Sequence, residues 1–185
     1  ARLFDRLAAV PDPAFAVRHV RHLLRTGRIE AAARRAEPLT RGSEAAHAWP
    51  YLAIAWRLLG DERWQWLEGD ERLVGVYDIM DAGEIAPLRE RLRSLHNTLS
   101  YPIGQSVRGG TQTDGPLFAR VDPEIRALRA RIVEAVEAHV VRFAPGDPAH
   151  PVLRYGGRKA AVRFAGSWSV RLAGAGFHTQ HIHQQ

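Results

Sequence analysis

Two glycines, Gly27 and Gly60, place the tightest limits on what this chain can fold into. They lie 33 positions apart, and each separates two runs of apolar residues at helical spacing, as in the run that carries Val20 and Leu23. Because a glycine commonly follows the last turn of a helix, this arrangement predicts two helix-turn-helix hairpins within residues 1–70. A period of about 34 residues is typical of helical repeat proteins, so we expect the hairpins to stack.

The second hairpin resembles a tetratricopeptide repeat. The large, large, small, aromatic and glycine positions of that repeat are held here by Trp49, Leu52, Ala53, Trp56 and Gly60. The first hairpin agrees less well, because Ala16 and His19 stand where bulky apolar residues are usual, although Gly27 and Ala32 are in place. The resemblance implies that the helices bind a protein partner or substrate. Two repeats are fewer than the roughly three that form a self-sufficient stack, so we expect further repeats upstream or support from the next domain.

The composition bounds the rest of the interpretation. The chain has 185 residues, 45% of them hydrophobic, which is enough for a core. It has no cysteine, so a disulfide framework and a thiolate metal site are excluded, and any metal must be held by His, Asp or Glu. The absence of cysteine fits a cytoplasmic location. No stretch approaches the roughly 18 apolar residues of a transmembrane helix, so we expect no membrane contact.

The charge is basic but dispersed. Of 26 basic residues only Lys159 is a lysine, and the 20 acidic residues leave a formal charge of +6. The arginines alternate with acidic residues, as in residues 89–93, which is typical of solvated helix faces. Because the positive charge is not gathered into one stripe, nucleic acid is not favoured as a partner.

Beyond residue 70 the pattern changes from helical to mixed. Alternating apolar residues predict a first strand over residues 73–79, and a helix is expected over 85–98. Asp122-Pro123-Glu124 combines an N-cap residue, a proline and a first-turn carboxylate, which predicts the start of a long helix. The buried stripe of that helix is expected at Ile125, Leu128, Ile132, Val133, Val136 and Val140. Strands are predicted at residues 161–164 and 168–172, so the fold class is α+β.

The glycine-rich segment 101–118 connects the two predicted helices. It lacks the Gly-Lys-Ser/Thr ending of a phosphate loop, so nucleotide binding is not favoured. Two interpretations are equally open: a surface loop, or a loop that lines a pocket with Gln105, Arg108, Thr111 and Gln112. Arg108 either faces that pocket or satisfies carbonyl groups of its own loop.

Three histidines follow a strand and a glycine turn near the end of the sequence. His181 and His183 are two residues apart, so a strand would present both imidazoles on one face. Such a pair is a bidentate metal-binding group suited to iron, zinc, copper or nickel. His178 is separated from both by an odd number of residues and is expected on the opposite face. Elsewhere, we expect His139 on the flank of a helix and His150 in a solvent-facing loop.

Two blocks, residues 105–113 and 167–172, precede Gly176-Phe177-His178 and His181-Ile182-His183. In this order they resemble the Fe(II)/2-oxoglutarate oxygenase domain that follows tetratricopeptide repeats in bacterial proteins, over about residues 70–183. The resemblance implies a helical region in residues 1–70 and the N-terminal part of a jelly roll, or double-stranded β-helix, in 71–185. It also implies Fe(II) and 2-oxoglutarate as cofactors, with His181 and His183 as the first metal ligands. Arg171 and His178 are added to the candidate pocket residues.

The sequence departs from that family where its site is completed. Better-known oxygenases carry His-x-Asp where this chain has His181-Ile182-His183, and the further strands expected after Gln185 are not in the sequence. We therefore expect a truncated oxygenase of the hydroxylase type that is inactive as this chain. An open sheet edge would then pair with another chain or a second copy. The alternative is a tetratricopeptide-type interaction module with a non-catalytic β domain.

Overall fold

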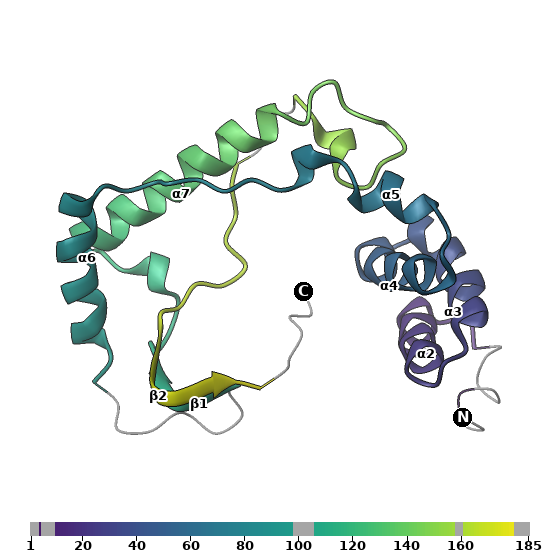
Figure 1. Ribbon diagram of the computed structural model, residues 1–185, viewed down its shortest axis with the longest axis horizontal. Coiled ribbons are helices and arrows are strands. Elements are labelled where there is room, and N and C mark those ends of the chain that lie inside the picture. The colour runs from purple at the N-terminus through teal and green to yellow at the C-terminus, as the bar shows by residue number, and fades with distance from the viewer. Residues whose placement is uncertain (1–3, 5–9, 98–105, 158–160, 180–185) are drawn as a thin grey trace. The chain divides into compact units, whose positions relative to one another are not determined.

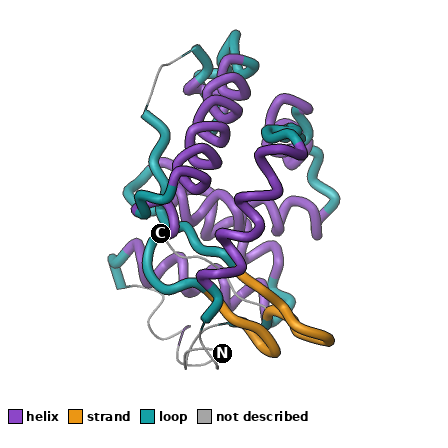
Figure 2. The backbone as a smooth tube through the Cα atoms, turned by 90° about the vertical axis from the view of Figure 1, so that its left-hand side faces the viewer, coloured by secondary structure: helices purple, strands orange, loops and turns teal. Residues whose placement is uncertain are grey.

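The computed structural model describes residue 4 and residues 10–97, 106–157 and 161–179. The chain divides into two compact units, residues 1–73 and 74–185, and each contains its own buried cluster (Figure 1). Figure 2 distinguishes the helices, in purple, from a two-stranded antiparallel sheet in orange. The coexistence of helices and an antiparallel sheet confirms the predicted α+β class.

The first unit contains helices and turns over its described residues. Asp12 starts the first long helix, because its Oδ1 accepts a 2.9 Å hydrogen bond from the backbone N–H of Phe15. The elements are α2 (Pro13–Arg25), α3 (Ile29–Ala36), the 3-10 turn η1 (Glu37–Arg41), α4 (Ala45–Leu59), α5 (Arg63–Glu68) and the 3-10 turn η2 (Glu71–Leu73). Helices α2 and α3 form one hairpin and α4 and α5 the next, in agreement with the predicted pair of hairpins.

The turns at Gly27 and Gly60 have the same backbone geometry. Both glycines have a positive φ, 73° and 68° respectively. In each turn the residue after the glycine donates its N–H to the carbonyl oxygen five positions back, at 2.9 Å: Arg28 to Leu23, and Asp61 to Trp56. These hydrogen bonds satisfy carbonyl groups that the end of a helix leaves free. The helix breaks predicted at both glycines are therefore confirmed.

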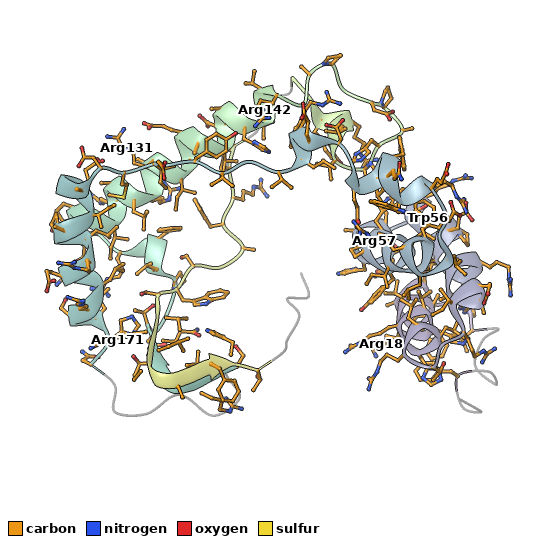
Figure 3. All side chains as sticks on the ribbon, in the orientation of Figure 1. Arg18, Trp56, Arg57, Arg131, Arg142 and Arg171 are labelled. Carbon is orange, nitrogen blue, oxygen red and sulfur yellow. The ribbon has the colours of Figure 1, made fainter. Side chains whose placement is uncertain are left out.

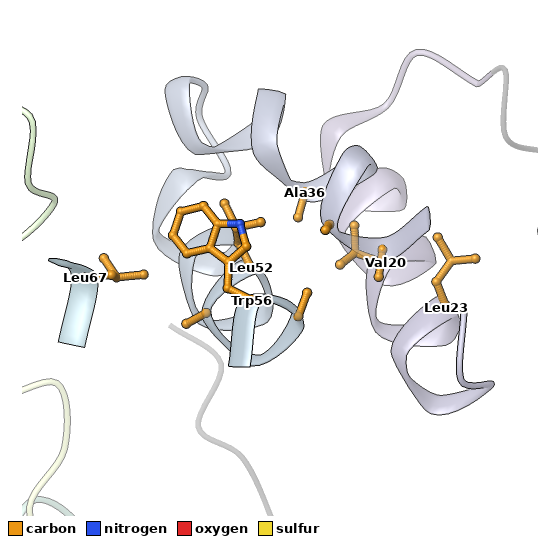
Figure 4. Close-up of a cluster of buried hydrophobic side chains, with 10 residues drawn as sticks. Val20, Leu23, Ala36, Leu52, Trp56 and Leu67 are labelled. Carbon is orange, nitrogen blue, oxygen red and sulfur yellow. The ribbon is translucent and has the colours of Figure 1, made fainter. Parts of the chain in front are cut away.

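Burial in the first unit also repeats at an interval of 33 residues. The residue pairs that are buried in both hairpins are His19 and Leu52, Val20 and Ala53, and Leu23 and Trp56. Figure 4 shows the side chains of this cluster, with the Trp56 ring among the smaller residues. Alanines fill the remaining contacts between the helices of this cluster: Ala32, Ala36 and Ala55 have no exposed surface. Small side chains at a helix contact permit a short interaxial distance.

His19 occupies a buried position for which the sequence predicted a bulky apolar residue. Its ring lies 5.6 Å from the Phe4 ring and 6.4 Å from the Phe15 ring, measured between centroids. The imidazole therefore packs as an aromatic residue would, which explains why a histidine fills this position of the first hairpin.

Replacing Gly60 with alanine should lower the free energy of unfolding by about 1 kcal/mol, because an L-residue is strained at a positive φ. The same change at Gly27 should have a similar effect, since no neighbouring atom lies within 4 Å of the added Cβ at either position. Gly42→Ala is the matched control, because Gly42 has an extended backbone, and its nearest contact would be 3.9 Å from the Leu39 carbonyl oxygen. Urea denaturation followed by circular dichroism measures all three. Equal effects at Gly42 and Gly60 would contradict the strained-turn explanation.

The second unit combines helices with the sheet. Its elements are α6 (Ala82–Leu95), β1 (Val107–Gln112), the 3-10 turn η3 (Leu117–Ala119), α7 (Pro123–Val141), the 3-10 turn η4 (Leu153–Tyr155) and β2 (Val170–His178). A capping box starts α6, in which Asp81 Oδ1 accepts from the N–H of Glu84 at 2.9 Å and Glu84 Oε2 accepts from the N–H of Asp81 at 3.2 Å. This cap explains why the helix begins at Ala82 and not at the predicted Ile85.

Helix α7 begins at Pro123, as predicted, but its expected buried stripe is mostly wrong. Among the six positions only Ile125 is fully buried, together with Leu88 of α6 and Leu117 of η3. The helix runs for 19 residues, and the described elements that cover it pack near its first turns. Val136, farther along, is 38% exposed. The apolar spacing therefore identified the helix but not the length of its buried face.

Asp122, the predicted N-cap of α7, uses its carboxylate differently. Its side chain makes no capping hydrogen bond. Oδ1 accepts from Arg91 Nε at 2.6 Å, and Oδ2 accepts from Arg120 Nε at 2.8 Å. The hydrogen bond from Arg91, followed by that from Arg120, holds the pKa of this carboxyl below its usual value. Asp122 thus joins α6 to the start of α7.

Three local predictions in the second unit are wrong. Residues 74–79 form no strand: Val74 is 73% and Val76 is 94% exposed, and no described strand pairs with them. Residues 161–164 are also irregular. Conversely, residues 107–112 of the predicted loop form strand β1. Alternating apolar residues form a strand only where a neighbouring strand supplies hydrogen bonds. In this unit it is the glycine-rich segment that has such a neighbour, strand β2.

Candidate functional site

The antiparallel pairing of β1 with β2 places the two blocks of the oxygenase resemblance side by side. Val107 pairs with His178 at one end, and Gln112 pairs with Val170 at the other. The pairing extends past the strand, where the N–H of Thr179 donates to the Ser106 carbonyl oxygen at 2.8 Å. The metal-ligand candidates His181 and His183, and the pocket candidate Gln105, lie outside the described residues.

Glycines let the two strands approach closely at a bulge between Arg108 and Gly110. A Cβ on Gly110 would lie 2.4 Å from the Arg171 carbonyl oxygen, and one on Gly176 would lie 2.3 Å from the Gly109 carbonyl oxygen. Both distances are shorter than a carbon and an oxygen can tolerate. Gly110 of β1 and Gly176 of β2 are therefore needed for pairing.

The described pocket candidates do not share one environment. Arg108 Nη1 donates to the Val107 carbonyl oxygen at 2.8 Å, which is the self-satisfying role left open for this residue. The ring of His178 is hydrogen-bonded through Nδ1 to Ser106 Oγ at 3.0 Å. Gln112 is half-buried in β1. Thr111 and Arg171 both lie near a histidine that the sequence had not identified as a candidate.

That histidine is His96, the residue that ends α6. Its Nδ1 lies 2.8 Å from Thr111 Oγ1 of β1, and its Nε2 lies 3.0 Å from Ser169 Oγ, next to the start of β2. The backbone reinforces this arrangement, because the N–H of Thr113 donates to the Ser169 carbonyl oxygen at 3.0 Å. His96 therefore ties the helix to both strands. A histidine at a helix end followed by two hydroxyl-bearing strand segments is a weak sequence signal, which explains why it was missed.

Burial lowers the pKa of His96 below its usual value, and the positive charge of Arg171 lowers it further. Both influences disfavour the imidazolium form. A neutral ring donates through one nitrogen and accepts through the other, which the two hydroxyl partners allow. At neutral pH the ring therefore serves as an uncharged hydrogen-bonded link.

Acidification below about pH 6.5 should destabilise the chain through His96. The pKa is lower in the folded than in the unfolded protein, so the unfolded protein takes up the proton first, and the free energy of unfolding decreases as pH falls. In His96→Gln, which keeps a donor and an acceptor, this part of the pH dependence should be absent. Urea denaturation of both proteins between pH 5 and 8 measures it. Parallel pH profiles would contradict the assignment.

A cavity of about 470 Å³ lies between α6 and the start of β2. Arg89, Arg93 and His96 line it from the helix, and Arg171 and Leu172 line it from the strand. Figure 3 labels Arg171 on the strand. The site thus combines guanidinium groups, a neutral imidazole and apolar side chains, which suits an anion more than a cation.

The other described histidines of this unit have structural surroundings. His150, predicted to face solvent, is 1% exposed, and its Nδ1 accepts hydrogen bonds from the N–H groups of Val152 and Leu153 at 3.1 and 3.0 Å. That prediction is wrong because the imidazole caps a tight turn. His139 lies on α7, where its Nδ1 is 2.7 Å from the hydroxyl of Tyr77. Within the described part of the chain, no three His, Asp or Glu side chains form a group that could hold a metal ion.

Comparisons with known proteins return no relative. No family model, curated protein or solved structure matches this chain. Among the helices of the described ranges, none has the length and apolar character required to cross a bilayer.

Proposed function

We propose that this chain is part of an Fe(II)/2-oxoglutarate-dependent oxygenase of the hydroxylase type, with His181 and His183 as metal ligands. The observation that carries the proposal is the pairing of β1 with β2. The two blocks of the resemblance are separated by more than fifty residues, yet they lie in adjacent antiparallel strands. In this register Val107 pairs with His178, and Gln112 pairs with Val170. Within the described residues the pairing reaches Thr179, two positions before His181 in the sequence.

The described residues do not by themselves fit an iron ion. They contain no group of three His, Asp or Glu side chains that could hold a metal ion. In the oxygenases that the chain resembles, bound iron and 2-oxoglutarate supply oxygen activation. In this chain, His181 and His183 would supply the first two metal ligands.

Anaerobic calorimetry with Fe(II) tests the proposal. The chain should bind the ion, binding should tighten with 2-oxoglutarate, and both effects should disappear in the His181→Ala, His183→Ala double variant. His139→Ala, which alters a histidine hydrogen-bonded to Tyr77, is the matched control and should bind as the parent does. Absence of binding, or equal binding by the double variant, would contradict the proposal.

A second candidate is a protein-interaction module of the tetratricopeptide type, with a non-catalytic β domain. It is supported by the repeated turn geometry at Gly27 and Gly60 and by the repeated burial of the two hairpins. Helix α4 also exposes Ile54 and Leu58 to solvent, which gives a partner apolar side chains to contact. A folded chain that fails to bind Fe(II) would favour this function over the oxygenase.

A further inference from the structure

Three arginines line the cavity between α6 and β2. Arg89 and Arg93 are four residues apart, so they project from one face of α6, and Arg171 reaches the same cavity from β2. An arginine fork presents parallel N–H groups that match the two oxygens of a carboxylate. The spacing and origin of the three side chains therefore place carboxylate-binding groups on two sides of the cavity.

The acidic residues near these arginines do not neutralise them. Arg89 and Arg93 share a single carboxylate, that of Glu90, at 3.4 and 3.0 Å. Arg171 has no hydrogen bond or ion pair with any side chain that the structure describes. Three positive charges thus face one negative charge, and the remaining positive charge attracts an anion to the cavity.

Part of the cavity lining is apolar. Leu88, which is 7% exposed, and Leu92 line it from α6, and Val170 and Leu172 line it from β2. An inorganic anion would leave these side chains in contact with water. An anion with a hydrocarbon body would cover them and gain the free energy of apolar burial.

One side of the cavity is held rigid. Both ring nitrogens of His96 are hydrogen-bonded, to Thr111 Oγ1 at 2.8 Å and to Ser169 Oγ at 3.0 Å. These contacts join the end of α6 to both strands in the absence of ligand. A preformed site loses less conformational entropy on binding.

We propose that this cavity binds a small organic carboxylate with a short aliphatic body. The carboxylate group pairs with Arg171 and Arg93, and the aliphatic chain lies over Leu88 and Leu92. The volume of about 470 Å³ is within the range of small-molecule sites. This site needs no metal ion, so carboxylate binding can be tested independently of the proposed oxygenase function.

A chain-length series of unbranched carboxylates, from acetate to octanoate, tests the site. Affinity is measured by calorimetry and by amide chemical shifts on the full 185-residue chain in metal-free buffer. Each added methylene should tighten binding by up to about fourfold until the cavity is filled. Shifts should concentrate on residues 88–96 and 169–172, and inorganic phosphate should bind much more weakly than hexanoate.

Variants assign the two halves of the site. Arg171→Gln should weaken hexanoate binding about tenfold or more, because a charge-assisted hydrogen bond is lost, and Arg93→Gln should act in the same direction. Leu92→Ser should weaken hexanoate but leave acetate nearly unchanged. The matched control is Arg126→Gln, which removes an exposed arginine from α7 and should leave binding as it is.

Three outcomes would overturn the proposal. Phosphate that binds as tightly as hexanoate would indicate a general anion surface. Affinity that does not rise with chain length would exclude the apolar half. Unchanged binding in both arginine variants, each shown to be folded by circular dichroism, would exclude the charged half. Because the buffer is free of metal ions, a failure here says nothing about Fe(II) binding, and a failure of the iron titration leaves this site intact.

Discussion

Replacing Trp56 with alanine should lower the free energy of unfolding of the helical unit by about 3 to 5 kcal/mol. Trp56 is 3% exposed and lies in the cluster shared by both hairpins, with its ring centroid 6.2 Å from that of Trp49. The Arg63 guanidinium carbon lies 4.6 Å from the same ring, so the truncation also removes a cation–π contact. Urea denaturation followed by far-ultraviolet circular dichroism measures the change.

Trp56→Phe is the matched control for this prediction. The indole Nε1 is buried and has no hydrogen-bond partner among the described residues, so phenylalanine forfeits no hydrogen bond. We expect it to lower the free energy of unfolding by less than alanine does, because phenylalanine keeps an aromatic ring and leaves a smaller cavity. If alanine and phenylalanine had equal effects, Trp56 would not be the centre of the helical core.

Replacing Gly176 with valine should abolish the pairing of β1 with β2. The new Cβ would lie 2.3 Å from the Gly109 carbonyl oxygen and 3.1 Å from that of Ala173. Both obstacles are backbone atoms, so no rotamer change relieves the overlap, and the strands must separate. The free energy of unfolding of the second unit should fall by about 3 kcal/mol, at the upper end of overpacking effects.

Amide hydrogen exchange reports this change directly. The N–H of Thr179 donates to Ser106 and that of Thr113 donates to Ser169, so both amides should lose protection in Gly176→Val. Ala175→Val is the matched control, because Ala175 precedes Gly176 in the same strand and its side chain is exposed. Retained protection of Thr179 in Gly176→Val would show that the strands tolerate the added side chain.

The helical half of the fold was predictable because its signals are local. Gly27 and Gly60 end helices through their own φ values, and the apolar residues around them face one cluster at a fixed period. The start of α7 was equally readable from Asp122 and Pro123, since capping preferences depend on a few neighbouring residues. The tetratricopeptide and oxygenase assignments remain predictions.

The strands and the candidate site were harder to predict because they depend on distant residues. Residues 74–79 alternate like a strand but have no partner, and the glycines of β1 have a partner in β2 that only the folded chain reveals. His96 became part of the site through hydroxyls at Thr111 and Ser169, which no local pattern connects. The error at His150 has a local cause, because its ring accepts hydrogen bonds from the N–H groups of Val152 and Leu153 and so caps a tight turn.

The proposed metal site beyond the β1–β2 pair can be located with Mn²⁺ and nuclear magnetic resonance. Mn²⁺ takes the place of Fe(II) and broadens the amide signals of residues close to it. We expect selective broadening at residues 177–179 and 106–107, which pair at that end of the strands, and its loss in His181→Ala, His183→Ala. Broadening centred elsewhere, or unchanged in the double variant, would contradict the proposed site.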